Sequence, residues 1–449
     1  MSEPLSVREA PASYVLDALR VRKGYKQTEV GVIPEDWDVK TLGMSCDIIT
    51  KGTTPTSIGR AFVKTGIKFL KAETISDSGK TIPEKVAYID DVTHALLKRS
   101  QLSSGDLLIS IAGVLGRVGL VERTDLPANT NQALAIVRLG KNTEIVRNFI
   151  FYCLRSPVIA KQISDINVQA AQANISLQNV KDFLLPLPPT KAEQEAIAEA
   201  LNDADALIEA LEQLIAKKRH LKQGAMQELL TGKKRLPGFG GEWEVRPLGE
   251  LFNFSGGYSA SREQLSSEGY CYLHYGDIHG SNKTYIDVRA EIQDIPKLDI
   301  PLKKVSSVSL LNDGDVVFVD ASEDDEGTSK HVVIVNPDKT PYISGLHTIV
   351  AKKKVDEFDH RYLRYCFQTT EVKAQFKFFA VGTKVSGISK TNIAKVLLPL
   401  PSVPEQTAIA TILSDMDADL AALEQQLAKA RNIKQGMMQE LLTGRVRLV

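Results

Sequence analysis

A few short stretches carry residue types that could support catalysis or metal binding, but their spacing is unsuitable. The glycines of "IAGVLGRVGL" at Ile111 are spaced GxxGxxG, whereas a dinucleotide site needs GxGxxG. The aspartates of "DAD" at Asp203 and "DMD" at Asp415 stand two apart on predicted helices, where side chains do not face each other. The 7 histidines are scattered, and no HExxH spacing occurs. The sequence therefore predicts no catalytic, cofactor-binding or metal-binding residues in this chain.

The chain consists of two halves that share several short strings of sequence. The string "KQGAMQELLTG" begins at Lys222, and "KQGMMQELLTG" begins at Lys434, 212 residues further on (434 minus 222). Other landmarks recur at similar spacing, such as "WDVKTLG" and "WEVRPLG", or "GDLLIS" and "GDVVFV". The last part of each half matches closely, and the part before it shares only landmarks. A period this long indicates a duplicated domain pair rather than a solenoid.

The closely matching parts predict two long helices. Glu193 to Leu230 and Glu405 to Leu442 contain no proline, and each begins with an acidic residue that suits a helix N-terminus. Each helix of about 38 residues would be about 57 Å long. Apolar residues recur in steps of four and three, which is the seam of two helices that pack knobs into holes. The predicted helix-pairing residues are Ile197, Leu201, Ile208, Leu211 and Ile215 in the first helix and Ile409, Leu413, Leu420, Leu423 and Leu427 in the second.

The matched seams favour pairing of the two helices with each other. The alternative is that each helix packs onto its own globular domain. Gly224 and Gly436 occupy equivalent places inside the helices, where glycine costs about 1 kcal/mol. They indicate either close approach of another backbone or simple tolerance.

The parts before the helices read as mixed α and β. "DLLISIAG" and "DVVFVDAS" predict buried strands, and "VRNFIFYCLRS" and "HRYLRYCFQTT" predict short amphipathic helices. "ISLQNVKDFLLPLP" predicts a helix that turns into an extended exit. The fold class is therefore α+β, with two mixed domains in tandem and two long helices that pair as an antiparallel coiled coil with pseudo-twofold symmetry.

Composition sets limits on the environment and on the partners. The chain has 55 basic and 55 acidic residues, so it is not a general polyanion binder, and any nucleic-acid face must be local. The 4 cysteines form no CxxC pair, which argues against a zinc or thioredoxin-like site, and their small number suggests a reducing compartment. The chain shows no apolar signal core and no stretch of about 18 apolar residues. We expect a cytoplasmic protein.

Two unlike domains on two like helices suit a bipartite, non-palindromic DNA target, with helix geometry setting the distance between half-sites. The tandem halves, the "LPLPP" and "LPLP" entries to the helices and the "KQGxMQELLTG" endings resemble the specificity subunits of type I restriction-modification systems. This resemblance covers the chain from about Gly31 and implies five segments. They are an N-terminal arm (1–30), target-recognition domain 1 (31–190), a central helical spacer (191–236), target-recognition domain 2 (237–401) and a C-terminal helical spacer (402–449).

The resemblance also implies partners and their cofactors. Two modification subunits would use S-adenosylmethionine to methylate adenine, and two restriction subunits would use ATP and Mg²⁺ to translocate and cut DNA. No cofactor is expected in this chain, which would be a non-catalytic subunit. The alternatives are a specificity subunit of a methyltransferase without a restriction partner, a helical adaptor that does not read DNA, and a nuclease with an unrecognised site.

Polar loop residues at matched places are the candidates for DNA contact. Arg and Lys suit guanine, and Asn and Gln suit adenine. The first domain offers Lys51, Thr53, Thr54, Lys71, Gln169, Gln172 and Asn174, and the second offers Tyr258, Ser259, His274, Tyr275, Thr383, Lys384 and Ser386. The first half lacks the Gly-Thr that the second carries in "AVGTKVSG". For each residue, a solvated loop side chain is the alternative interpretation.

Overall fold

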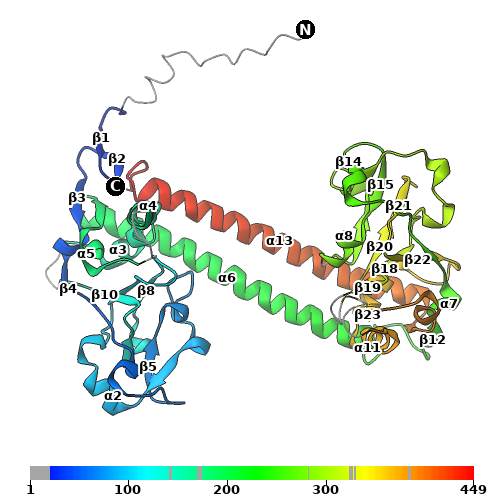
Figure 1. The fold of residues 1–449 in the computed structure, drawn as a ribbon, viewed down its shortest axis with the longest axis horizontal. Coiled ribbons are helices and arrows are strands. Elements are labelled where there is room, and N and C mark those ends of the chain that lie inside the picture. The colour runs from blue at the N-terminus through cyan, green and yellow to red at the C-terminus, as the bar shows by residue number, and fades with distance from the viewer. Residues whose placement is uncertain are drawn as a thin grey trace, which may run out of the picture. The chain divides into compact units, whose positions relative to one another are not determined.

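The structure, a computed structural model, describes residues 21–140, 144–168, 174–281, 283–322, 327, 330–382 and 386–448. The chain forms two compact units (Figure 1). The first unit runs to Glu212 and includes the chain again from Gln425, and the second is Gln213–Glu424. Each unit holds one globular domain and parts of both long helices.

The main sheet of the first unit has four antiparallel strands in the order β4-β10-β7-β8. They are β4 (Cys46–Lys51), β10 (Leu134–Leu139), β7 (Leu107–Ser110) and β8 (Val118–Leu120). All four residues of β7 are buried, which confirms the strand predicted from "DLLISIAG". Gly113 and Gly116 of the GxxGxxG stretch lie in the turn from β7 to β8 and take positive φ, and Gly119 lies in β8.

Smaller sheets complete this unit. One has the order β6-β5-β9, with β5 and β9 parallel, and two are two-stranded. These strands are β5 (Ile67–Leu70), β6 (Ala87–Ile89), β9 (Ala128–Thr130), β1 (Tyr25–Thr28), β2 (Gly31–Pro34), β3 (Asp38–Thr41) and β11 (Leu184–Leu187). The short helices are α2 (Asp91–Leu96), α3 (Arg147–Leu154), α4 (Pro157–Val168) and α5 (Leu177–Asp182). The step from α5 into β11 confirms the predicted helix and extended exit.

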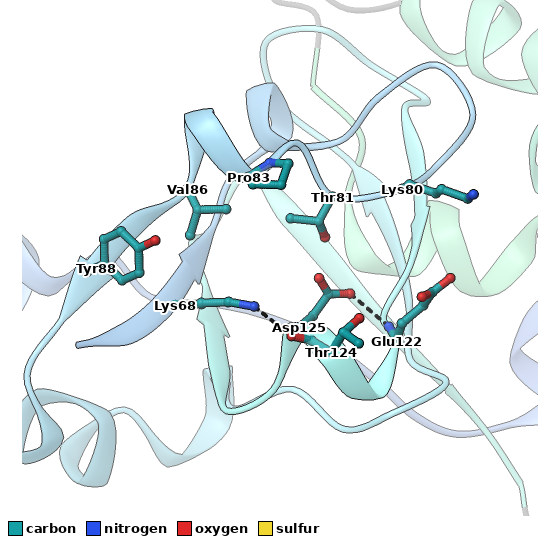
Figure 2. A pocket seen from close by; sticks show the side chains of 9 residues that line it. All are labelled: Lys68, Lys80, Thr81, Pro83, Val86, Tyr88, Glu122, Thr124 and Asp125. Atoms are coloured by element: carbon teal, nitrogen blue, oxygen red, sulfur yellow. Dashed lines mark hydrogen bonds between the residues drawn. The ribbon is translucent and has the colours of Figure 1, made fainter. Parts of the chain in front are cut away.

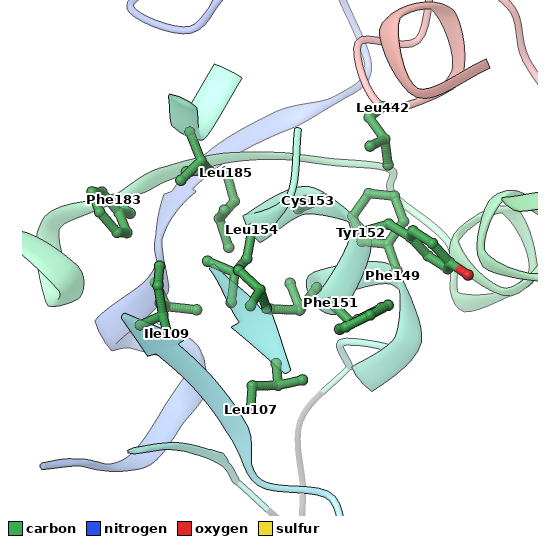
Figure 3. Packing of buried hydrophobic residues seen from close by; sticks show 14 of the residues in the cluster. Leu107, Ile109, Phe149, Phe151, Tyr152, Cys153, Leu154, Phe183, Leu185 and Leu442 are labelled. Atoms are coloured by element: carbon green, nitrogen blue, oxygen red, sulfur yellow. The ribbon is translucent and has the colours of Figure 1, made fainter. Parts of the chain in front are cut away.

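The core of the first unit lies between β7 and α3. Figure 3 shows Leu107 and Ile109 of β7 facing the side chains of α3, with Leu442 from the far end of the chain packed beside them. Six consecutive α3 residues, Phe149–Leu154, are buried, so the prediction of an amphipathic helix is wrong there. One side of α3 packs on the sheet, and Tyr152 on another side donates to Asp205 of a long helix at 3.0 Å. From Phe149 onward the helix is therefore covered all round, while Arg147 and Asn148 at its start are exposed.

The second unit repeats this plan with a larger sheet, ordered β13-β22-β18-β20-β16. These strands are β13 (Phe252–Gly256), β22 (Thr348–Lys353), β18 (Val316–Val319), β20 (His331–Val335) and β16 (Tyr285–Asp287). The other strands are β12 (Glu244–Pro247), β14 (Leu265–Ser266), β15 (Tyr270–Leu273), β17 (Lys297–Leu298), β19 (Ala321–Ser322), β21 (Tyr342–Ser344), β23 (Ser386–Gly387) and β24 (Leu397–Leu400). The short helices are α7 (Leu248–Leu251), α8 (Tyr275–His279), α9 (Val288–Glu291), α10 (His360–Cys366), α11 (Thr370–Phe379) and α12 (Lys390–Ile393).

Helix α10 corrects the second amphipathic prediction, because its residues Tyr362–Cys366 are all buried. As Tyr152 does in the first unit, Tyr365 reaches a long helix, where its hydroxyl donates to the Asp417 carboxylate at 2.6 Å. Strand β18, which is fully buried, confirms the strand predicted from "DVVFVDAS".

The two long helices are α6 (Lys191–Leu229) and α13 (Val403–Leu441), each of 39 residues. In the first unit Asp205 pairs with Lys434, and Glu212 pairs with Arg431 at 2.6 Å. The helices run antiparallel, because the partner number falls as the α6 number rises.

The second unit holds the symmetry-related contacts. Adding 212 to Asp205 and subtracting 212 from Lys434 gives the pair Asp417 and Lys222, whose atoms are 2.5 Å apart. The same operation turns Glu212 and Arg431 into Glu424 and Arg219, at 2.6 Å. Repetition of both ion pairs confirms the predicted antiparallel pairing and its pseudo-twofold symmetry.

The seam residues differ in what covers them. Ile197 and Leu201 are fully buried in the core of the first domain, as Ile409 and Leu413 are in the core of the second. The first turns of each helix therefore pack onto their own domain, which is the alternative interpretation. Further along, Ile215 and Leu420 are buried. The half-buried members are Ile208, Leu211, Leu423 and Leu427.

Gly224 and Gly436 have open space around them. A Cβ built on either glycine meets no other atom within 4 Å, leaving aside the helix's own nearby backbone. The interpretation of close backbone approach is wrong among the described residues, and tolerance of a small residue explains both positions. Gly232 and Gly444, which end the helices, take φ of +70° and +68°. This left-handed conformation suits glycine at a helix C-terminus.

Candidate nucleic-acid interface

The described contact candidates of the first domain, Lys51, Thr53, Thr54, Lys71 and Asn174, lie at one edge of its sheets. Lys51 pairs with Ala135, and Leu134 pairs with Ser110, so β4 ends, β10 begins and β7 ends at the same edge. Strand β5 reaches this edge too, since Leu70 pairs with Thr130 just before β10 begins. Loops that follow these strands therefore lie side by side, although they are far apart in the sequence.

The loop after β4 is fixed against the turn before β10. The Thr53 amide donates to the Thr130 carbonyl at 3.1 Å, and the Thr54 hydroxyl contacts the Gln132 side chain. A Cβ on Gly52 would lie 2.0 Å from the Thr130 oxygen, so only glycine allows this approach. Arg99 donates to the Thr53 hydroxyl at 3.1 Å. The loop is held in one conformation with a cation beside it.

The other candidates of the first domain are placed as follows. Lys51 is exposed at the end of β4. The Lys71 ammonium lies 4.9 Å from the centroid of the Phe62 ring and 3.7 Å from the Glu73 carboxylate. Asn174 is exposed and pairs through its backbone with Ala112, just beyond the end of β7. Gln169 and Gln172 lie outside the described residues.

The second domain has the same arrangement. The Tyr258 amide donates to the Ser344 carbonyl at 2.7 Å, and a Cβ on Gly257 would lie 1.8 Å from the Gly345 oxygen. The Gly345 amide donates to the Leu273 carbonyl at 2.9 Å, which brings the end of β15 to the same place. His274 follows directly. Tyr258, Ser259, His274 and Tyr275 therefore share one edge, where Ser259 and Tyr275 are exposed.

Aromatic rings cluster at this edge. The ring centroids of His274 and Tyr275 are 5.0 Å apart, and those of Tyr275 and His347 are 5.7 Å apart. Burial, followed by the positive charge of Arg262, lowers the pKa of His274. Its neutral ring accepts a hydrogen bond from the Gly276 amide at 3.1 Å, with His274 capping α8. Such rings could stack against bases or donate to their edges.

Ser386 reaches the same edge through the pairing of β23 with β19, where it lies opposite Ser322. The Ile388 amide donates to the Asp320 carbonyl at 2.9 Å, as the Ile175 amide does to the Ile111 carbonyl in the first domain. Ser386 is half-buried. Thr383 and Lys384 lie outside the described residues.

One further loop in each domain lies at the same edge and was not predicted from the sequence. The turn Asn131–Ala133 joins β9 to β10, and the turn Gly345–His347 joins β21 to β22. The turns carry the exposed side chains of Gln132 and His347. The available signal was a polar residue just before a buried strand, in "NQALAIV" and "GLHTIVA". Arg99 was also missed, because its link to Thr53 depends on tertiary contact.

A separate pocket in the first domain is about 260 Å³ in volume (Figure 2), and its lining includes Lys68, Thr124 and Asp125. Lys68 there donates to the Thr124 carbonyl at 2.6 Å, and the Asp125 carboxylate accepts from the Glu122 amide at 2.9 Å. These polar groups stabilise the local loop. Across the described residues, no group of three or more His, Cys, Asp or Glu is placed to hold a metal ion. No described helix is long and apolar enough to cross a membrane.

The fold and the site define a class of protein: two mixed α/β domains in tandem, each with a rigid polar loop edge, attached to two antiparallel helices. The family described as the type I restriction modification DNA specificity domain matches residues 34–217 and 240–430. The chain belongs to this family.

Individual relatives agree with this assignment. The chain is 28% identical to a putative type I restriction enzyme MjaX specificity subunit of Methanocaldococcus jannaschii, over 95% of this chain and 97% of that protein. It is 26% identical to the EcoBI specificity subunit of Escherichia coli over 45% and 43% of the two chains.

Solved structures show the same fold. The crystal structure of the type I restriction-modification S subunit from M. genitalium matches with a TM-score of 0.55 and 16% identity, covering 94% of this chain and 98% of that one. A chain from a type I R-M system assembly matches with a TM-score of 0.54 and 17% identity, covering 92% and 99%.

Proposed function

We propose that this chain is the sequence-reading subunit of a type I restriction-modification complex, in which each domain reads one half of a bipartite, asymmetric DNA site. The observation that carries the proposal is the gathering of polar loops at one sheet edge in each domain. Rigid loops on a sheet scaffold are suited to base readout, because their side chains are already ordered before binding. The two edges differ in residue type, so the two half-sites should differ.

The paired helices α6 and α13 would set the number of base pairs between the half-sites and recruit the other subunits. Two modification subunits would bring S-adenosylmethionine, and two restriction subunits would bring ATP and Mg²⁺. This chain would supply neither cofactor nor catalytic group. Double-stranded DNA would be its direct ligand.

Mapping of methylated adenine on the host chromosome tests this proposal. With the gene intact we expect a motif of two unlike half-sites separated by unread base pairs, and deletion should abolish methylation at that motif. An unchanged methylation pattern after deletion would overturn the proposal. Replacing residues 237–397 with the matching domain of a relative should change one half-site only.

Two further experiments test the other classes of function. The purified chain is incubated with random duplex DNA over a salt series, since phosphate contacts weaken steeply with salt and base contacts confer sequence preference. A helical adaptor would show no sequence preference. Incubation of the purified chain with Mg²⁺ and DNA tests for a nuclease, and cutting by the chain alone would contradict a non-catalytic role.

A further inference from the structure

The turn missed in each domain lies centrally at its loop edge. In the first domain the turn Asn131–Ala133 leaves β9, which pairs with β5, and enters β10, which lies between β4 and β7. In the second domain the turn Gly345–His347 leaves β21, which pairs with β15, and enters β22, which lies between β13 and β18. Each turn therefore joins two sheets of its domain, with the other candidate loops on either side of it.

Hydrogen bonds to neighbouring strands hold the backbone of both turns in place. In the first domain the Thr130 hydroxyl donates to the Leu70 carbonyl at 2.8 Å. In the second domain the Thr348 hydroxyl donates to the Gly345 carbonyl at 2.6 Å, and the Leu346 amide donates to the Tyr272 hydroxyl at 3.3 Å. The backbone is thus fixed. The side chains of Gln132 and His347 are exposed, and the Gln132 amide oxygen also contacts the Thr54 hydroxyl.

His347 also has an unusual backbone. Its φ is +61°, and the only other described non-glycine residue with positive φ is Lys339, at 53°. A residue with a Cβ rarely adopts this conformation, and such outliers concentrate at functional sites. The side chain is 60% exposed, edge-on to Tyr275, with Nδ1 3.7 Å from the Asp320 carboxylate. The strained turn thus presents an oriented polar ring to solvent.

We propose that His347 is a base-contacting residue of the second domain and that Gln132 is its counterpart in the first. This inference rests on the proposed DNA-reading function. A glutamine amide can pair with N6 and N7 of adenine in the major groove, and a ring N–H of histidine can donate to a purine acceptor there. Each side chain would read a purine in its own half-site.

Host strains that carry single substitutions in the full-length chain test this inference by adenine-methylation mapping. His347→Gly removes the ring, and glycine accepts the positive φ, so folding is not put at risk. We expect methylation at sites mismatched at one base pair of one half-site to rise about tenfold relative to correct sites, as loss of one good base contact predicts. Gln132→Ala should do the same in the other half-site. His347→Asn, which tolerates positive φ, should change the base preferred at the same position.

Lys339→Gly is the matched control. It releases the same kind of backbone strain in the turn from β20 to β21, at the opposite edge of the sheet, and should leave the motif unchanged. A motif that stays unchanged in His347→Gly and Gln132→Ala would overturn the inference, as would weaker methylation without altered base preference. Absence of any gene-dependent motif in the unsubstituted strain would instead overturn the proposed function.

Discussion

Arg235 and Glu405 form a bidentate ion pair, with two nitrogen–oxygen distances of 2.7 Å. Arg235 lies just past the end of α6, and Glu405 lies in the first turn of α13. The same pairing recurs between Arg447 and Glu193. Each arginine also lies over the tryptophan that opens its domain, 5.6 Å from the Trp243 ring and 5.7 Å from the Trp37 ring. Each arginine thus connects the end of one long helix to the first turn of the other helix and to the tryptophan of the adjoining domain.

Substitution of Arg447 should destabilise the first unit. The Glu193 side chain is 1% exposed, so Arg447→Met leaves a buried carboxylate without its partner, at a cost of about 3 kcal/mol. Urea unfolding would measure the loss, and hydrogen exchange should place it around Trp37. Arg235→Met is the matched variant and should act around Trp243 instead. Recovery of part of the stability in Arg447→Met with Glu193→Gln is expected, and no recovery would contradict the ion-pair explanation.

The two interior glycines should be replaceable with a gain in stability. Gly224→Ala and Gly436→Ala should each add about 1 kcal/mol to the free energy of unfolding, since a Cβ meets nothing there and alanine favours helix. Thermal unfolding of each variant measures this gain.

The terminal glycines are the contrast. Gly444→Ala should lower stability by at least about 1 kcal/mol, because φ is +68° and its Cβ would lie 2.5 Å from Pro34. For the interior glycines, a loss of stability in Gly224→Ala would contradict the open space around that position.

Acid should weaken the second unit through Asp417. Burial raises the pKa of this carboxyl, but hydrogen bonds from Lys222 and Tyr365 outweigh that effect and hold the pKa below its ordinary value of 3.8. Because the pKa is lower in the folded state, the stabilisation is present above about pH 4 and is lost as pH falls through the folded pKa. The free energy of unfolding should therefore fall less steeply with acid in Asp417→Asn than in the parent chain. Urea titrations between about pH 3 and pH 6 would measure both slopes, and equal slopes would refute the assignment.

The proposed spacing role of the helices predicts the effect of lengthening them. Adding one heptad to both α6 and α13 extends each by about 10.5 Å, equal to about three base pairs of duplex. The unread gap between half-sites should grow by that amount, with both half-sites unchanged, in a methylation map of the host. Insertion into one helix alone is the control and should break the register of the ion pairs. An unaltered gap after the double insertion would exclude the helices as the determinant of spacing.

The repeated helical string has a physical explanation in these contacts. Lys222 and Lys434 open the two "KQG" motifs, and they pair with Asp417 and Asp205 of the "DMD" and "DAD" motifs. Each motif therefore appears twice because each end of an antiparallel pair needs one acidic and one basic partner. The sequence showed both strings and their spacing, but it did not show that one string contacts the other.

The sequence by itself determined the duplication, the two long helices and their apolar seams, because helix periodicity is written in neighbouring residues. Only the tertiary structure decided which polar residues share a sheet edge. Pairing of Lys51 with Ala135 and of Gly256 with Ile349 brings together loops that lie about 80 to 90 positions apart, and no local pattern encodes such register. A polar residue before a buried strand marks Gln132 and His347 in the sequence, but their central place at the edge arises from strand order, which neighbouring residues do not show.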